Sequence, residues 1–165
     1  MTRALLALVL AMGASAGALA TGQPIVGPAT VVDSTVIEID GRRIMLFGID
    51  SVMRKQVCAL EGKPWQCWAA AVRDLQLLVD QGPSVCDPVG EPDLFGRVLA
   101  RCAINGRSLN EELVRRGYAV ARPAESTDYV AAEAEAKAAK RGLWQGQFMR
   151  PNDFRRAAGI FVDRP

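Results

Sequence analysis

The stretch GPATVVDSTVIEIDGRRIMLFGID, residues 27–50, sets the architecture of this chain. It contains three runs rich in Val, Ile and Thr in which apolar and polar side chains tend to alternate, a pattern typical of half-buried strands. Asp40 and Gly41 separate the second run from the third, and an Asp-Gly pair in this position indicates a tight hairpin. The stretch therefore predicts three consecutive strands at the start of a β-rich domain.

Further elements follow this stretch along the chain. Residues 64–81 change to helical spacing, and Pro64 suits the first turn of a helix. Two more strand-like runs come next, PSVCDPV at residues 83–89 and RVLARCAI at residues 97–104. We expect these two strands to be joined by a turn.

The remaining predicted elements lie toward the C-terminus. Ser108 and Glu111 have the spacing of a capping box, which predicts a short helix that ends at Gly117. Residues 118–120 suggest a short strand, and residues 126–141, rich in Ala, Glu and Lys, predict a third helix. The order β-β-β-α-β-β-α-α predicts an α+β, mainly β fold: a five-stranded OB-type Greek-key barrel with three packed helices.

The first twenty residues have the three parts of a secretory signal peptide. Arg3 supplies the charge, residues 4–12 the apolar core, and Ala18-Leu19-Ala20 the small-residue cleavage site. A membrane anchor is the alternative, but residues 4–20 are shorter than the about 20 apolar residues that a span needs. No later segment is apolar enough to cross a bilayer, so we expect an exported protein, periplasmic or extracellular. The expected division is a signal peptide (1–20), a short segment (21–26), one domain (27–145) and a C-terminal tail (146–165).

Four cysteines in an exported chain favour disulfide bonds. Cys86 and Cys102 lie in two strand-like runs separated by a turn, so a cross-strand bond is the simplest pairing. Cys58 and Cys67 would then close a local loop. Four cysteines permit three connectivities, and this is the one that we favour.

Charge and composition exclude several classes of function. The net charge is only +2, far from the surplus expected of a strong nucleic-acid binder, although a local basic patch is still allowed. The chain contains no histidine. Catalytic systems that need histidine and His-ligated zinc are therefore excluded. Any catalysis would depend on Asp, Glu, Lys, Arg, Tyr or a bound ion.

Two segments carry a resemblance to a known family. They are RRIMLFGIDSVM at residues 42–53 and DLFGRVLA at residues 93–100, supported by LNEELVRRGYA and YVAAEAEAKAAKRGLW further along. The set resembles the staphylococcal nuclease (thermonuclease) family, and the run VCALEGKPWQCW resembles its exported bacterial members with four cysteines. The resemblance implies the same OB-type fold and a calcium-dependent phosphodiesterase ancestry.

The resemblance places the family's calcium ligands on two aspartates. The family's D-G-D-T turn aligns with residues 32–35: one alignment puts Ser34 at the metal aspartate, and a one-residue gap keeps Asp33 but deletes the second aspartate. Asp50 retains the other calcium carboxylate. Because calcium prefers six to eight oxygen ligands, we expect Asp33 and Asp50 to form at most a vestigial, weak ion site.

The catalytic positions are more altered. Met45 stands where the family has its first arginine, Met53 where it has the glutamate that handles water, and Arg97 retains the second arginine. Phosphodiester hydrolysis needs cations that stabilise negative charge and a base that orients water. We therefore interpret Arg97 as a vestigial catalytic residue, and the two methionines as packing residues.

Structural roles stay open for the surviving charges. Asp93 and Arg97 bracket a turn and can pair across it. Asp50 can accept backbone N–H bonds in a turn, or form an ion pair with Arg97. Phe95, where the family has tyrosine, is either a stacking platform or a packing residue. The basic pairs at residues 115–116 and 155–156 are expected to lie on solvated faces.

The resulting hypothesis is an exported thermonuclease-like domain with a degenerate active site, serving as a non-catalytic binding or interaction module. No cofactor is expected, or calcium if the protein is active. The first alternative is a calcium-dependent nuclease acting on DNA or RNA with an altered ion site built from Asp33, Asp50 and Arg97. The second is a structural envelope protein. The sequence names no partner, and the stacking aromatics that would favour nucleic acid are largely missing.

Overall fold

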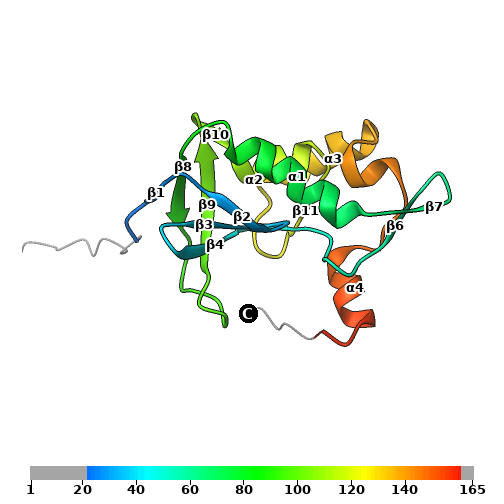
Figure 1. Cartoon of the computed structure of the whole chain (residues 1–165), viewed down its shortest axis with the longest axis horizontal. Helices are drawn as coiled ribbons and strands as arrows, with labels where there is room; N and C mark the ends of the chain where they lie inside the picture. The colour runs from blue at the N-terminus through cyan, green and yellow to red at the C-terminus, as the bar shows by residue number, and fades with distance from the viewer. Residues whose placement is uncertain (1–21, 161–165) are drawn as a thin grey trace, which may run out of the picture.

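The computed structural model describes residues 22–160, so the expected signal peptide at residues 1–20 lies outside the described residues. A curled sheet forms one side of the molecule, and helices α1, α2 and α3 pack against its inner face (Figure 1). The strands are β1 (Ile25–Gly27), β2 (Thr30–Asp33), β3 (Val36–Ile39), β4 (Arg42–Leu46), β5 (Ile49–Asp50), β6 (Cys58–Leu60), β7 (Lys63–Trp65), β8 (Ser84–Pro88), β9 (Val98–Ile104), β10 (Arg107–Ser108) and β11 (Val120–Ala121). The helices are α1 (Cys67–Val79), α2 (Leu109–Arg115), α3 (Val130–Ala138), the 3-10 turn η1 (Gly142–Gln145) and α4 (Pro151–Ala157).

The main sheet confirms the predicted fold class. Its strands run in the order β1-β8-β9-β4-β3-β2, with β10 paired to β9, and every pairing is antiparallel except that of β4 with β9. The five predicted strands correspond to β2, β3, β4, β8 and β9. The sheet has seven strands because the short β1 and β10 add to it. Two small ladders, β11 with β5 and β6 with β7, lie outside it.

The predicted hairpin joins β3 to β4. Asp40 and Gly41 both have positive φ, 49° and 73°, as a tight primed turn requires. The register pairs Val36 with Met45, so Met45 on β4 lies opposite the first residue of β3. This hairpin places Met45 next to the turn that carries Asp33.

The three predicted helices are present with shorter bounds. Ser108 caps α2, because its hydroxyl accepts the backbone N–H of Glu111 at 3.2 Å, as the capping box predicted. The third helix begins at Val130 rather than residue 126. The helix α4 lies within the expected tail, apart from α1–α3 (Figure 1). Within residues 22–160, none of the helices has the length and apolar character that a membrane span requires.

Two hydrophobic clusters stabilise this arrangement. The larger one joins the inner face of the sheet to α1, α2 and α3 through side chains such as Ile37, Ile44 and Leu113. The smaller one gathers Val52 and Leu143 around the Cys58–Cys67 bridge. The site described below borders the second cluster.

Both predicted disulfide bonds are confirmed. Cys86 and Cys102 are direct register partners on β8 and β9. Cys58 on β6 is bonded to Cys67 at the start of α1. The described residues contain no free cysteine.

Candidate functional site

A cavity of about 300 Å³ opens at the end of the barrel where β2, β4 and β5 meet α4. The residues that the sequence singled out all line it: Asp33, Met45, Asp50, Met53 and Arg97. The fold thus brings together positions that are up to 64 residues apart in the chain. The structure supports this clustering, and the partners of each residue indicate what the cavity can do.

Asp50 ends β5 and is buried, with 4% of its surface exposed. One carboxylate oxygen accepts the backbone N–H of Ser51 at 2.9 Å, as expected for a turn carboxylate. Both oxygens accept hydrogen bonds from the guanidinium of Arg155 on α4, one of them at 3.1 Å. The expected alternative, an Asp50–Arg97 ion pair, is therefore wrong, because Arg155 occupies this carboxylate.

Asp33 ends β2 and is also engaged. Its Oδ1 accepts the indole N–H of Trp68 on α1 at 2.6 Å and the backbone N–H of Ser34 at 2.7 Å. The guanidinium of Arg54 stacks over the same indole, 4.5 Å from the ring centre. The Asp33 side chain thus joins the β2–β3 turn to helix α1.

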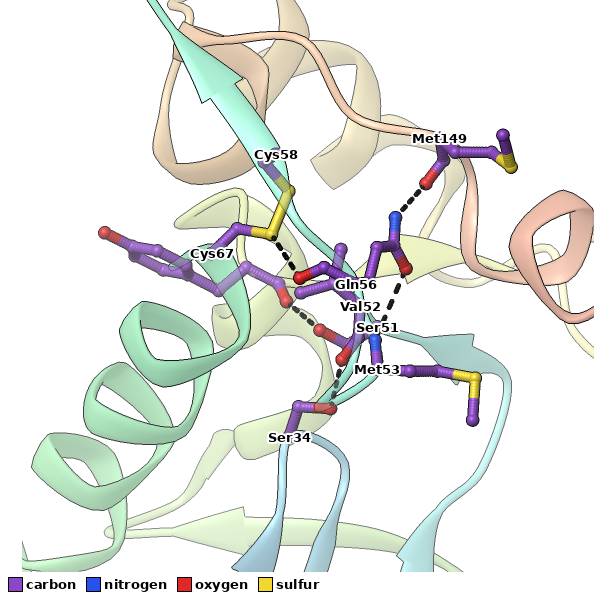
Figure 2. The surroundings of a disulfide bond; sticks show 9 residues. Ser34, Ser51, Val52, Met53, Gln56, Cys58, Cys67 and Met149 are labelled. Carbon is purple, nitrogen blue, oxygen red and sulfur yellow. Dashed lines mark hydrogen bonds between the residues drawn. A yellow bond between two sulfur atoms is a disulfide. The ribbon is translucent and has the colours of Figure 1, made fainter. Parts of the chain in front are cut away.

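The two methionines differ in their surroundings. Met45 is buried, with 4% of its surface exposed, and it forms an apolar part of the cavity wall. Met53 is half-buried, and its side chain extends away from the Cys58–Cys67 bridge (Figure 2). A thioether can neither donate a hydrogen bond to a phosphate oxygen nor take a proton from water. These two wall positions therefore offer packing, not acid–base chemistry.

Arg97 pairs across its turn with Asp93, as one of the structural interpretations predicted. Its Nε and Nη2 lie 2.7 and 2.6 Å from Oδ2 of Asp93, and its guanidinium stacks 5.0 Å from the ring centre of Phe95. Asp93 Oδ1 also accepts the backbone N–H groups of Phe95 and Arg97. Burial raises the pKa of the Asp93 carboxyl, but the hydrogen bonds from Arg97 and Phe95 outweigh it and hold the pKa below its usual value.

We expect Asp93→Asn to lower the free energy of unfolding by about 1 kcal/mol at neutral pH, since the charge-assisted bond to Arg97 is lost. A carboxylate with a lowered pKa stabilises the fold above its unfolded pKa, and this contribution disappears as the pH falls through the folded pKa. The difference between wild type and variant should therefore shrink below about pH 4. Urea unfolding at several pH values measures it. Asp87→Asn, at an exposed position on β8, is the control, and a pH-independent difference would contradict the assignment.

The oxygen groups around the cavity do not fit a calcium ion. Asp50 is held by Arg155 and Asp33 by Trp68. The Ser34 and Ser51 hydroxyls donate to the carbonyls of Val52 and Tyr118, at 3.0 and 2.6 Å. Within residues 22–160, no group of three or more His, Cys, Asp or Glu side chains gathers to hold a metal. Calcium takes six to eight oxygen ligands, and while Arg155 neutralises Asp50 these groups do not provide them.

Sequence reasoning missed three residues at this site. Arg155 was expected on a solvated face, but its side chain is only 13% exposed against Asp50. Arg122 lines the cavity and pairs with Glu125 at 3.0 Å. Gln56 is almost fully buried: its Oε1 accepts the Met53 N–H at 3.4 Å, and its Nε2 donates to the Met149 carbonyl at 2.5 Å (Figure 2). A local signal existed only for α4 itself, where Pro151 suits the first position of a helix.

The other expected solvated pair is also more engaged than the sequence suggested. Arg116 binds Asp74 with Nε and Nη2, at 2.6 to 3.0 Å. Arg115 pairs with Glu111, Glu112 and Glu135. The bonds to Asp74 and Glu135 join α2 and its C-terminal cap to α1 and α3, and those to Glu111 and Glu112 lie within α2. None of these residues lines the cavity, so they have no part in the candidate site.

Comparison with known proteins agrees with the fold. A family model described as "Staphylococcal nuclease homologue" matches residues 43–146. The succinoglycan biosynthesis protein ExoI of Rhizobium meliloti (strain 1021) is 33% identical over 129 residues, covering 76% of this chain and 67% of that protein. The chain belongs to the staphylococcal nuclease homologue family.

Proposed function

We propose that this chain is an exported, non-catalytic member of its family, and that the cavity at the former active site serves as a binding module. One observation carries the proposal: each of the five charged side chains that line the cavity has a partner within the described protein. These side chains are Asp33, Asp50, Arg97, Arg122 and Arg155. Catalysis of phosphoryl transfer needs fixed charges aimed at the reacting group, whereas each of these charges is held by another side chain of the protein.

The missing groups set the scale of the expected loss. Met53 stands at the position of a base, whose removal typically costs ~10²–10⁴ in rate. Met45 stands at the position of a transition-state donor, whose removal costs ~10²–10³. The two effects do not simply multiply, but together they leave little catalysis above background.

The nuclease test uses the disulfide-bonded protein with single-stranded DNA and with RNA, in calcium or in chelator. We expect no cleavage beyond the buffer rate in either condition, and no difference between wild type and Arg97→Ala. A nuclease of known activity in the same buffer is the positive control. Cleavage that requires calcium and disappears in Arg97→Ala would overturn the proposal in favour of a calcium-dependent nuclease.

Export forms part of the same proposal. The two disulfide bonds support it, because such bonds persist mainly in oxidising compartments. The signal-peptide pattern at residues 1–20 supports it independently. Fractionation of cells that express the full chain, followed by N-terminal sequencing of the exported form, tests both the compartment and the expected cleavage after Ala20.

A glycan is a second candidate for the partner. The relative ExoI is named for succinoglycan biosynthesis, and the rim of the cavity here carries Phe95 with 66% of its surface exposed. An exposed aromatic ring offers a large apolar face to a ligand. Calorimetric titration with succinoglycan oligosaccharides tests this candidate. Binding that is lost in Phe95→Ala but kept in Leu94→Ala, its exposed neighbour, would favour it.

A further inference from the structure

The tail helix α4 is fastened to the barrel mainly by polar contacts. Of its seven residues, all of them within the described range, only Pro151 is buried. Arg155 binds Asp50, and just before the helix Arg150 binds Glu133 at 3.0 Å. The carbonyl of Met149 accepts the side-chain N–H of Gln56 (Figure 2). A helix of this length does not form stably without such tertiary contacts.

The Asp50–Arg155 ion pair is the innermost of these contacts. The two side chains are 6% and 13% exposed, and the residues are 105 positions apart in the chain. The guanidinium meets both carboxylate oxygens, the paired geometry that makes such contacts strong. A buried carboxylate without a counter-charge would be costly, so Asp50 needs a cation at this place.

We propose that the Arg155 guanidinium is a built-in cation that takes the place of a metal ion at Asp50, and that this ion pair holds α4 as one wall of the cavity. The proposal goes beyond the binding function and does not depend on it, because it concerns how the cavity is closed. While Arg155 is bound to Asp50, the carboxylate is neutralised and a divalent cation would be repelled by the guanidinium. Arg155 and a metal ion therefore cannot bind Asp50 at the same time. Asn152 and Arg155 both line the cavity from α4, so release of the helix removes that wall.

The first test measures the attachment of α4 in the full, disulfide-bonded protein. We expect Arg155→Gln and Asp50→Asn each to lower Tm by about 5–10 °C. Each should speed amide hydrogen exchange in residues 154–158, whose N–H groups make the hydrogen bonds of the helix, by about tenfold or more. The Tm of the Asp50→Asn/Arg155→Gln double variant should not fall below that of the less stable single variant, because each single substitution already removes the Asp50–Arg155 contact.

Arg156→Gln is the matched control for these variants. It removes the same charge from the next position of the same helix, but its side chain is 70% exposed and, among residues 22–160, pairs only with Asp153 on α4. Its Tm and its exchange rates should stay at the wild-type values. Exchange in α4 that is unchanged in Arg155→Gln, or equally fast in Arg156→Gln, would overturn the attachment. If Arg155→Gln does not fold, Arg155→Lys keeps the charge but loses the paired geometry, and an intermediate rise in exchange is expected.

The second test asks whether Arg155 replaces a metal. Calcium chloride should leave the Tm of wild type unchanged relative to chelator, and should raise the Tm of Arg155→Gln, in which Asp50 lacks its cation. The gain should disappear in the Asp50→Asn/Arg155→Gln double variant. Stabilisation of the wild type by calcium, or an Arg155→Gln variant that does not respond, would overturn the replacement. These readouts are independent of nuclease activity and of ligand binding, so their failure and the failure of the proposed function are distinguishable.

Discussion

Asn110→Ala is expected to lower the free energy of unfolding by about 2–4 kcal/mol, since it removes the side-chain partner of two backbone groups, the Cys102 N–H and the Phe47 carbonyl. Asn110 lies in the first turn of α2 and has no exposed surface. Its Oδ1 accepts the backbone N–H of Cys102 at 3.0 Å. Its Nδ2 donates to the carbonyls of Phe47 and Ala100, at 2.9 and 3.3 Å.

The position explains the size of this effect. The parallel pairing of β4 with β9 ends at Leu46 and Ala100. The Phe47 N–H then donates to the Ala100 carbonyl at 2.9 Å, and the Asn110 amide adds a second link between the Phe47 carbonyl and β9. Alanine cannot supply either hydrogen-bonding group, and its better helix propensity returns only about 0.5 kcal/mol. Urea unfolding monitored by fluorescence measures the loss. Gln76→Ala, which removes an exposed amide with one side-chain bond on α1, is the control and should change stability by less than about 0.5 kcal/mol.

A loss below about 1 kcal/mol in Asn110→Ala would contradict this role, because a single net hydrogen bond is worth that much. Asn110→Asp provides a second check. It keeps the acceptor for the Cys102 N–H but places a carboxylate against the carbonyls of Phe47 and Ala100. We expect it to be at least as destabilising as alanine near neutral pH, because a buried unpaired charge is costly.

The parts of the fold that could be predicted have local signals. The β3–β4 hairpin follows from Asp40-Gly41 between two β-branched runs, and α2 follows from its capping box. The Cys86–Cys102 bond follows from two runs that become adjacent strands. In each case, the structure is predicted by residues close together in the sequence or by the turn that joins two neighbouring segments. The helix α4 carries a weaker signal, Pro151 at its first position, because seven residues give little periodicity.

The partners within the site could not be predicted in the same way. Asp50 and Arg155 are 105 residues apart, and nothing next to Arg155-Arg156 indicates which of the two points inward. The indole N–H of Trp68 on α1 donates to Asp33, 35 residues earlier in the chain. Such contacts depend on how helices and strands are positioned relative to one another in the folded protein, which local sequence patterns do not specify. The sequence therefore identified five residues of the cavity and the Arg97–Asp93 pair, but not the partners of Asp33 and Asp50.

Removing the Cys86–Cys102 bond is the second change with a large expected effect. Replacing both residues by alanine should lower the free energy of unfolding by about 3 kcal/mol, the chain-entropy value for a loop of this length. The two residues are separated by 16 positions and lie in the main hydrophobic cluster, with at most 2% of their surface exposed. Lost packing of the two sulfur atoms adds to the entropic effect. Urea unfolding in oxidising buffer measures it.

The Cys58–Cys67 pair is the matched comparison, because its loop spans only nine positions and its chain-entropy value is about 2.5 kcal/mol. Its removal should act more locally. This bridge connects the β6–β7 ladder and the start of α1 in the small cluster with Val52, whose carbonyl accepts the Ser34 hydroxyl beside the cavity (Figure 2). Hydrogen exchange should therefore rise around residues 52–60 in the Cys58→Ala/Cys67→Ala variant, and throughout the main sheet in the Cys86→Ala/Cys102→Ala variant. The same exchange pattern in both variants would contradict this division. Distinct patterns would mean that the Cys86–Cys102 bond stabilises the main sheet, whereas the Cys58–Cys67 bond stabilises the segment beside the cavity.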